Sequence, residues 1–166
     1  MSSRDLLKLY FGLVYPHLLY GIEIYANTYT SYLNKLHILN NKLLRIILHE
    51  NIRIPVTDLY KTANVLPIEK LHIYNILLLV HKFIYNKDLL PTIFQNYFVP
   101  TTNIHSHNIR SKATSLYIIS VSNSRGKRNT KFKAPQLWNT LNQDIKNIPS
   151  YSMFKLTPKN HLLHGN

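Results

Sequence analysis

Hydrophobic residues recur at helical spacing through the first half of the chain, which predicts a series of amphipathic helices. Ser2 or Ser3 can cap the first of these helices. Its apolar face consists of Leu6, Leu9, Tyr10, Leu13 and Val14. Pro16 lies within the same pattern. Because proline removes a backbone hydrogen bond and crowds the preceding turn, we expect a kink or a restart near Tyr15.

Further helices are expected before residue 88. Thr30 or Ser31 can cap a second helix, which Ile54-Pro55 closes. The apolar stripe of this helix, with Asn40 set into it, consists of Leu33, Leu36, Leu43, Leu44 and Ile47. A short helix is predicted over about residues 57–64. A third long helix is predicted over residues 68–85, and because it is apolar on most sides we expect it to be buried.

The second half of the chain has a different composition. Residues 89–143 contain no acidic residue. The basic residues of this span are Arg110, Lys112, Arg125, Lys127, Arg128, Lys131 and Lys133. A short strand is predicted over residues 116–121, and an exposed basic loop over residues 122–130. Pro135 is expected to precede a short helix around residues 137–145, and a weaker helical stretch follows through Phe154.

These patterns together predict a mainly α-helical protein. We expect an irregular helical bundle with a basic, loop-rich C-terminal half. The change of character divides the chain into a helical region, residues 1–88, and a basic region with loops and short helices, residues 89–166.

The charge balance indicates a polyanionic partner. Twenty Lys and Arg stand against seven Asp and Glu, which gives a formal net charge of +13. A surface of this kind attracts the RNA or DNA backbone through counterion release, although a basic protein without a specific partner would have the same composition. The longest apolar run, Ile76 to Val80, is far shorter than the ~18 residues of a membrane helix. We therefore expect no membrane partner and an intracellular location, in the nucleus or cytoplasm.

Two groups of basic residues are candidates for phosphate contact, and Arg110 and Lys112 are further candidates. Lys35, Lys42 and Arg45 share one face of the second helix, where they could follow a nucleic-acid backbone or simply form a solvated surface. The second group lies within residues 125–133, where Phe132 could stack on a base. The cations of this second group are Arg125, Lys127, Arg128, Lys131 and Lys133. A disordered basic linker is the alternative for the second group.

The sequence offers no catalytic centre and no cofactor or metal site. The seven acidic residues are widely separated, whereas nucleotidyl transfer with two metal ions needs clustered carboxylates. The chain has no cysteine, no His-Glu-x-x-His motif and no glycine-rich phosphate loop. His105 and His107 form the only close histidine pair and lack a third ligand at a recognisable spacing.

Several motifs occur in an order that resembles the region after the polymerase domain of non-LTR (LINE-type) retrotransposon reverse transcriptases. The elements that carry this resemblance are Leu9-Tyr10 through Tyr20-Gly21 around Pro16, the run Leu36 to Ile47, Val65-Leu66-Pro67-Ile68, Leu89-Leu90-Pro91, Ala134 to Leu141 with its Leu-Trp-Asn core, and Phe154-Lys155. Asn40 and Tyr25 depart from the family, which commonly has Gln and Trp there. The resemblance covers roughly residues 6–164, and it places Arg110 where the family usually has a lone arginine.

The resemblance implies a fragment of an RNA-directed DNA polymerase that lacks the catalytic palm. The Tyr-x-Asp-Asp element that holds the metal ions in such enzymes is absent. A divalent metal is therefore expected only in the missing polymerase domain, and this chain alone is expected to be inactive. The implied partners are RNA or DNA and the remainder of the reverse transcriptase. Two alternatives stay open, namely a helical domain that binds an acidic protein and a decayed transposon-derived reading frame without activity.

Overall fold

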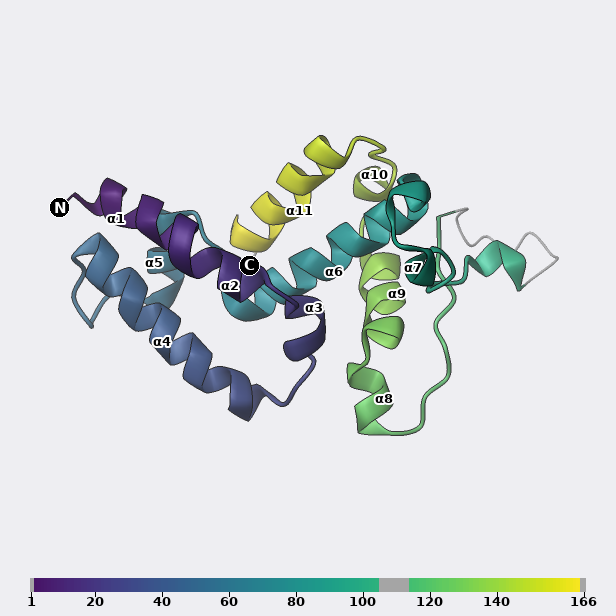
Figure 1. Cartoon of the computed structure of the whole chain (residues 1–166), viewed down its shortest axis with the longest axis horizontal. Helices are drawn as coiled ribbons and strands as arrows, with labels where there is room; N and C mark the ends of the chain where they lie inside the picture. The colour runs from purple at the N-terminus through teal and green to yellow at the C-terminus, as the bar shows by residue number, and fades with distance from the viewer. Residues whose placement is uncertain (1, 105–113, 165–166) are drawn as a thin grey trace. The chain divides into compact units, whose positions relative to one another are not determined.

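A computed structural model describes residues 2–104 and 114–164 of the chain, and these residues are mainly helical (Figure 1). The predicted mainly α class is therefore confirmed. The residues fall into two compact units, which are described separately. The first unit contains residues 1–72 and 159–166, and the second contains residues 73–158. The division predicted after residue 88 lies inside the second unit and stays a prediction.

The first unit begins with a helix that changes its winding before Pro16. Ser2 caps α1 (Ser3–Leu9), as expected, by accepting a hydrogen bond from the Asp5 backbone. A π-helical stretch, η1 (Tyr10–Val14), then leads into α2 (Tyr15–Leu19), which has Pro16 in its first turn. The predicted restart near Tyr15 is therefore present. Gly21 follows in the left-handed conformation, with φ of 66°, before the short helix α3 (Ile22–Tyr25).

The long helices of the first half occur where the pattern predicts them, but the second ends at Leu48 and not at Ile54-Pro55, because His49 takes the left-handed conformation. The first unit continues with α4 (Thr30–Leu48) and α5 (Val56–Ala63), which contact each other, and α4 also contacts α1. The chain then enters α6 (Ile68–Tyr85), which continues into the second unit. Most of its apolar side chains are buried, as its all-round apolar pattern predicted.

A buried polar chain links three helical segments of the first unit. The Tyr10 hydroxyl donates to the Asn40 side-chain oxygen over 3.0 Å, and the Asn40 amide donates to the Tyr60 hydroxyl over 3.0 Å. Tyr60 in turn donates to the Asn41 side chain over 2.8 Å. Burial raises the pKa of both tyrosine hydroxyls above its ordinary value, so both remain protonated donors at neutral pH. Asn40 therefore interrupts the apolar stripe of α4 because it joins η1 to α5.

The second unit consists of the C-terminal part of α6 and a series of shorter elements. These are η2 (Lys87–Leu89), α7 (Thr92–Gln95), η3 (Thr101–Asn103), α8 (Ser124–Arg128), α9 (Thr130–Thr140), α10 (Gln143–Lys146) and α11 (Tyr151–His164), the last of which continues into the first unit. Trp138 and Phe154 are fully buried, with ring centroids 5.8 Å apart. His81 of α6 stacks on Phe154 at 4.2 Å.

The strand predicted over residues 116–121 is wrong. Within the described ranges, the segment forms only an isolated antiparallel bridge, between Leu116 and Pro100. The bridge bonds run from the Thr101 N–H to the Ser115 carbonyl and from the Tyr117 N–H to the Val99 carbonyl. On the other edge of the segment, the side-chain oxygen of Asn139 accepts from the Leu116 N–H and its amide donates to the Leu116 carbonyl, over 3.0 and 2.8 Å. Both backbone groups of Leu116 are thus bound to a side chain of α9, so no second strand can pair with Leu116 on that edge.

The exposed loop predicted over residues 122–130 is also wrong, because most of it is helical. Asn123 caps α8 by accepting a hydrogen bond from the Gly126 N–H over 2.7 Å, and Asn129 caps α9 by accepting from the Lys131 N–H over 2.9 Å. Pro135 lies inside α9 rather than before it. Two asparagine caps in succession therefore turn the basic stretch into two short helices.

Among the described residues, no single helix combines the length and apolar composition that a membrane crossing needs, although α5 and α6 pass that criterion as a pair bent by 47°.

His81 is a buried histidine in the second unit whose protonation should affect stability. Its Nε2 lies 2.8 Å from the Ile148 carbonyl, and the rings of Tyr85 and Tyr151 flank it at 4.8 and 5.9 Å. Burial lowers the pKa of His81 below its ordinary value of 6.5, and the bond to Ile148 partly opposes this. The unfolded chain therefore binds a proton at this position at a higher pH than the folded chain does.

We expect the contribution of His81 to the free energy of unfolding to be constant above about pH 7 and to fall as the pH drops below 6.5. The measurement is urea unfolding across this range for the wild type and for His81→Gln, which keeps a side-chain amide near the Ile148 carbonyl. The difference between the two proteins should shrink towards acid, because only the wild type has the buried imidazole. A difference that is independent of pH would contradict the assignment.

Candidate nucleic-acid interface

The basic residues of the second half lie mainly on α8 and α9 of the second unit. Arg125 and Lys127 are exposed on α8, and Lys131 is exposed in the first turn of α9. Arg128, Phe132 and Lys133 are half-buried. We call the six side chains the α8–α9 basic surface, and they are Arg125, Lys127, Arg128, Lys131, Phe132 and Lys133.

The segment directly before α8 approaches the helix closely at Gly126. A Cβ atom on Gly126 would lie 2.9 Å from Cγ1 of Val121 and 3.0 Å from Oδ1 of Asn123. The glycine thus permits the backbone of α8 to approach the preceding segment more closely than any larger residue would. Arg125 and Lys127 therefore lie on a capped helix and not in an extended linker.

Like charges are crowded on this surface. Burial lowers the pKa of the Lys133 ammonium below its ordinary value, and the charge of Arg128 lowers it further. A negative group placed between these side chains would offset both effects, because it would stabilise the charged lysine and neutralise the repulsion. Chemically, the arrangement suits an anion such as a phosphate.

An aromatic ring that the sequence pattern did not indicate lies beside this surface. Nζ of Lys131 is 5.7 Å from the centroid of the Tyr97 ring. Phe94 and Phe98 pack edge-on against the same ring, with centroid distances of 5.6 and 5.0 Å. Tyr97 is far from Lys131 along the chain and lies in no basic motif, so only the folded structure brings the two together.

The Leu-Trp-Asn motif lies in the C-terminal part of α9 and has a structural role. Nε1 of Trp138 donates to the Thr114 carbonyl over 2.8 Å, and Asn139 holds Leu116 through the two bonds described above. The buried ammonium of Lys146 donates to the Asn139 carbonyl, near the C-terminus of α9, over 2.9 Å. A cation at this end of a helix complements the helix dipole. The motif therefore anchors α9 against residues 114–116.

The other candidate cations are in the first unit or outside the described residues. Lys35 and Lys42 are exposed on α4. Arg45 is half-buried and donates from Nη2 to the Ile54 carbonyl over 3.2 Å, so part of its guanidinium holds the segment after α4. Arg110 and Lys112 lie outside the described residues, as do His105 and His107. The structure thus brings together the six residues of the α8–α9 basic surface, while the α4 group belongs to a different unit.

The residues that the structure describes contain no group of three or more His, Cys, Asp or Glu side chains arranged to hold a metal ion.

A comparison of the chain with models of protein families, with curated proteins and with solved structures found no match.

Proposed function

We propose that the chain binds the phosphate backbone of RNA or DNA through the α8–α9 basic surface. The observation that carries the proposal is the concentration of cations on two adjoining capped helices. Residues 73–158 contain eleven Lys and Arg against two Asp and Glu, and five of these cations lie between residues 125 and 133. Neither of the two acids belongs to α8 or α9.

The details of this surface favour a backbone ligand. Arg125, Lys127 and Lys131 are exposed, so their charges can reach a phosphate without a change in the fold. The ring of Tyr97 beside Lys131 and the half-buried Phe132 offer aromatic groups on which an unpaired base could stack. Single-stranded nucleic acid is the ligand that fits best.

The same proposal includes the origin of the chain. The ordered motifs that resemble a non-LTR reverse transcriptase favour a post-polymerase fragment, whose role would be to hold template RNA or target DNA for a polymerase domain elsewhere. An in-frame Tyr-x-Asp-Asp element in the genomic sequence upstream of this reading frame would support that origin, whereas an independent promoter with stop codons in every frame would contradict it.

Reversing two charges on α8 tests the proposed role. We expect Arg125→Glu with Lys127→Glu to weaken binding to a labelled single-stranded RNA by about tenfold or more at low salt. The slope of log affinity against log salt concentration should also decrease by about 1 to 2, since each lost phosphate contact removes ~0.7 for a single strand. Fluorescence anisotropy across a potassium chloride series measures both quantities.

The matched control is Lys87→Glu with Lys155→Glu. It reverses the charges of two exposed lysines that belong to the same unit but not to the α8–α9 basic surface. The two variants carry the same net charge, so a non-specific charge effect would weaken them equally. Equal losses in the two variants, or no loss in the α8 variant, would overturn the placement of the site on α8 and α9.

A further inference from the structure

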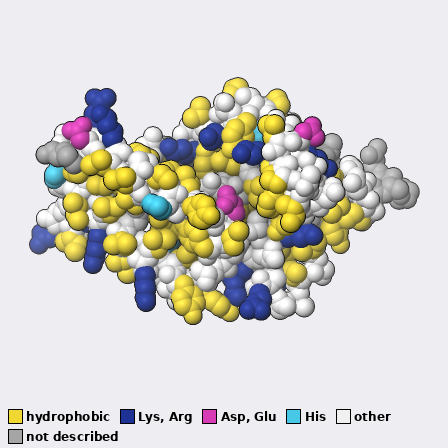
Figure 2. All heavy atoms as spheres, viewed as in Figure 1, with side chains coloured by type: hydrophobic (Ala, Val, Ile, Leu, Met, Phe, Trp, Pro, Cys, Tyr) yellow, Lys and Arg dark blue, Asp and Glu magenta, His cyan; other side chains and the backbone are white. Residues whose placement is uncertain are grey.

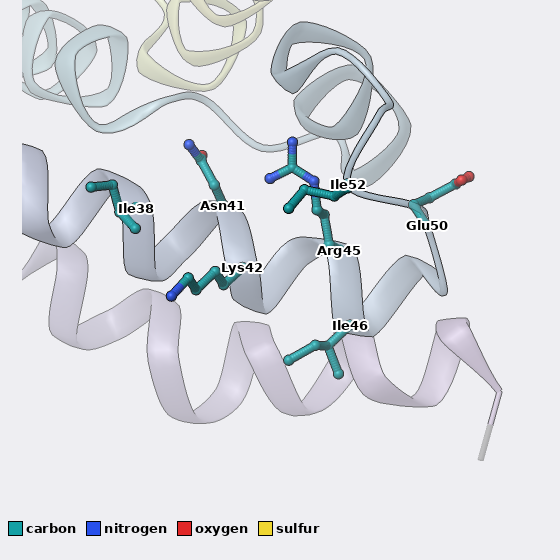
Figure 3. Close-up of a pocket in the computed structure, with 7 residues that line it drawn as sticks. All are labelled: Ile38, Asn41, Lys42, Arg45, Ile46, Glu50 and Ile52. Carbon is teal, nitrogen blue, oxygen red and sulfur yellow. The ribbon is translucent and has the colours of Figure 1, made fainter.

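The first unit contains an apolar groove that the proposed nucleic-acid surface does not use. The groove has a volume of about 460 Å³ and lies between α4 and the segment that follows it (Figure 3). Its lining residues are Ile38, Asn41, Lys42, Arg45, Ile46, Glu50 and Ile52. The aliphatic members are unusually exposed, with 48% of Ile38, 66% of Ile46 and 82% of Ile52 accessible to solvent. Figure 2 shows one face of the molecule, on which further hydrophobic side chains gather over the N-terminal helices.

The walls of the groove are held in place by α4 and by a hydrogen bond. Ile38, Lys42 and Ile46 are four residues apart along α4, so they form one row on the helix surface. The bond from Arg45 to the Ile54 carbonyl ties the following segment, which contains Ile52, back to the helix. The groove is thus preformed in the free chain, which lowers the entropic cost of filling it.

The charge at the groove is positive where a ligand would lie. Lys42 is exposed and extends from the same row as the isoleucines, while Glu50 extends away from the other lining side chains (Figure 3). Cations and aliphatic side chains also alternate along α4 at Lys35, Leu39, Lys42 and Ile46, all of them exposed. These four residues are spaced by four, three and four positions, which is the spacing at which a second helix packs along a first.

We propose that this groove binds an amphipathic helix of another protein, one that presents aliphatic side chains flanked by glutamate or aspartate. The aliphatic residues of such a helix would fill the space between the three isoleucines, and its carboxylates would meet Lys42 and Lys35. A nucleic acid fits less well, because the lining contains no aromatic side chain and three aliphatic ones. A second copy of this chain is disfavoured because its seven acids occur singly along the sequence and form no acidic helical face.

A synthetic helix tests the proposal on the full-length chain. The probe is a fluorescein-labelled peptide of about 20 residues, long enough to be helical, with leucines at i, i+3, i+4 and i+7 and glutamates beside them. We expect saturable binding to the wild type, and binding weakened about tenfold by either Ile46→Ser or Lys42→Glu. A peptide with the same leucines and lysines in place of the glutamates should bind much more weakly.

Matched controls separate the groove from the rest of the molecule. Ile93→Ser removes an isoleucine of similar exposure in the second unit, and Lys87→Glu reverses an exposed lysine there. Both should leave peptide binding unchanged. A loss that follows Arg125→Glu with Lys127→Glu would instead assign the peptide to the α8–α9 basic surface and overturn the proposal. The proposal would also be overturned if RNA bound at Arg125 and Lys127 displaced the peptide.

A measurement on the unaltered chain removes any dependence on how the variants fold. Addition of the glutamate peptide to the isotopically labelled wild type should shift the backbone amide resonances of residues 38–52 and leave those of residues 124–133 in place. Shifts spread over the basic stretch, or absent from α4, would contradict the proposal.

Discussion

Replacing Trp138 by alanine is expected to destabilise the chain by about 3–5 kcal/mol, the largest effect of any single substitution considered. The indole is fully buried in the second unit, where it packs against Phe154 and donates a hydrogen bond to the Thr114 carbonyl. Alanine would leave a large cavity and an unpaired carbonyl, two costs that add. Urea unfolding followed by far-UV circular dichroism gives the change in the free energy of unfolding.

Two further variants separate packing from hydrogen bonding at this position. Trp138→Phe keeps an aromatic ring but removes the bond to Thr114, so we expect a smaller loss than with alanine. Tyr20→Ala removes a ring that is 87% exposed and should change stability by less than about 0.5 kcal/mol. If the alanine variants at positions 138 and 20 were equally stable, the buried role of the Leu-Trp-Asn motif would be refuted.

Replacing Asn40 by leucine should destabilise the chain by about 2–3 kcal/mol, even though the two side chains are similar in size. The substitution leaves the Tyr10 hydroxyl without its acceptor inside the first unit. Tyr60 retains its bond to Asn41, so it contributes less to the loss. The exposed neighbour Asn34 serves as the control, and Asn34→Leu should have almost no effect.

The double variant Asn40→Leu with Tyr10→Phe provides the sharper result. Because the second change removes the stranded hydroxyl, the pair should be more stable than the sum of the two single losses indicates, by about 1–2 kcal/mol. Strict additivity of the two substitutions would mean that Tyr10 and Asn40 do not interact, in contradiction to the 3.0 Å bond between them.

The sequence predicted best those elements whose pattern is local and strong. The helix expected over residues 68–85 occurs as α6 with the same bounds, because a predominantly apolar segment without proline or glycine lies between Pro67 and Asn86. The short helix expected from about residue 57 is present as α5. The break expected from Pro16 is present too, although only the structure shows that a π-helical stretch accommodates it.

The errors fall where a distant side chain decides the local structure. Residues 116–121 have the composition of a strand, but one edge of Leu116 is bound by the side chain of Asn139. No sequence pattern near Leu116 indicates that a residue of α9 binds there. The loop expected at residues 122–130 depended on composition, whereas Asn123 and Asn129 act as helix caps. Asparagine favours turns and caps alike, so sequence reasoning could not decide between them.

The sequence indicated the cations of the candidate site but not the contacts that the fold gives them. A run of cations is visible in the sequence, and the structure places it on α8 and α9. The approach of Tyr97 to Lys131 and the use of Arg45 to hold Ile54 depend on tertiary contacts, which a linear pattern does not contain. Because the bond to Ile54 engages part of the Arg45 guanidinium, Lys35 and Lys42 are the freer cations of α4.

The most direct test of the central claim is the affinity of the wild-type chain for single-stranded RNA and DNA across a series of salt concentrations. We predict binding at low salt, with log affinity falling linearly against log salt and a slope that corresponds to several released counterions. The absence of binding at low salt, or an affinity that does not change with salt, would contradict the proposal that this chain holds a nucleic-acid backbone.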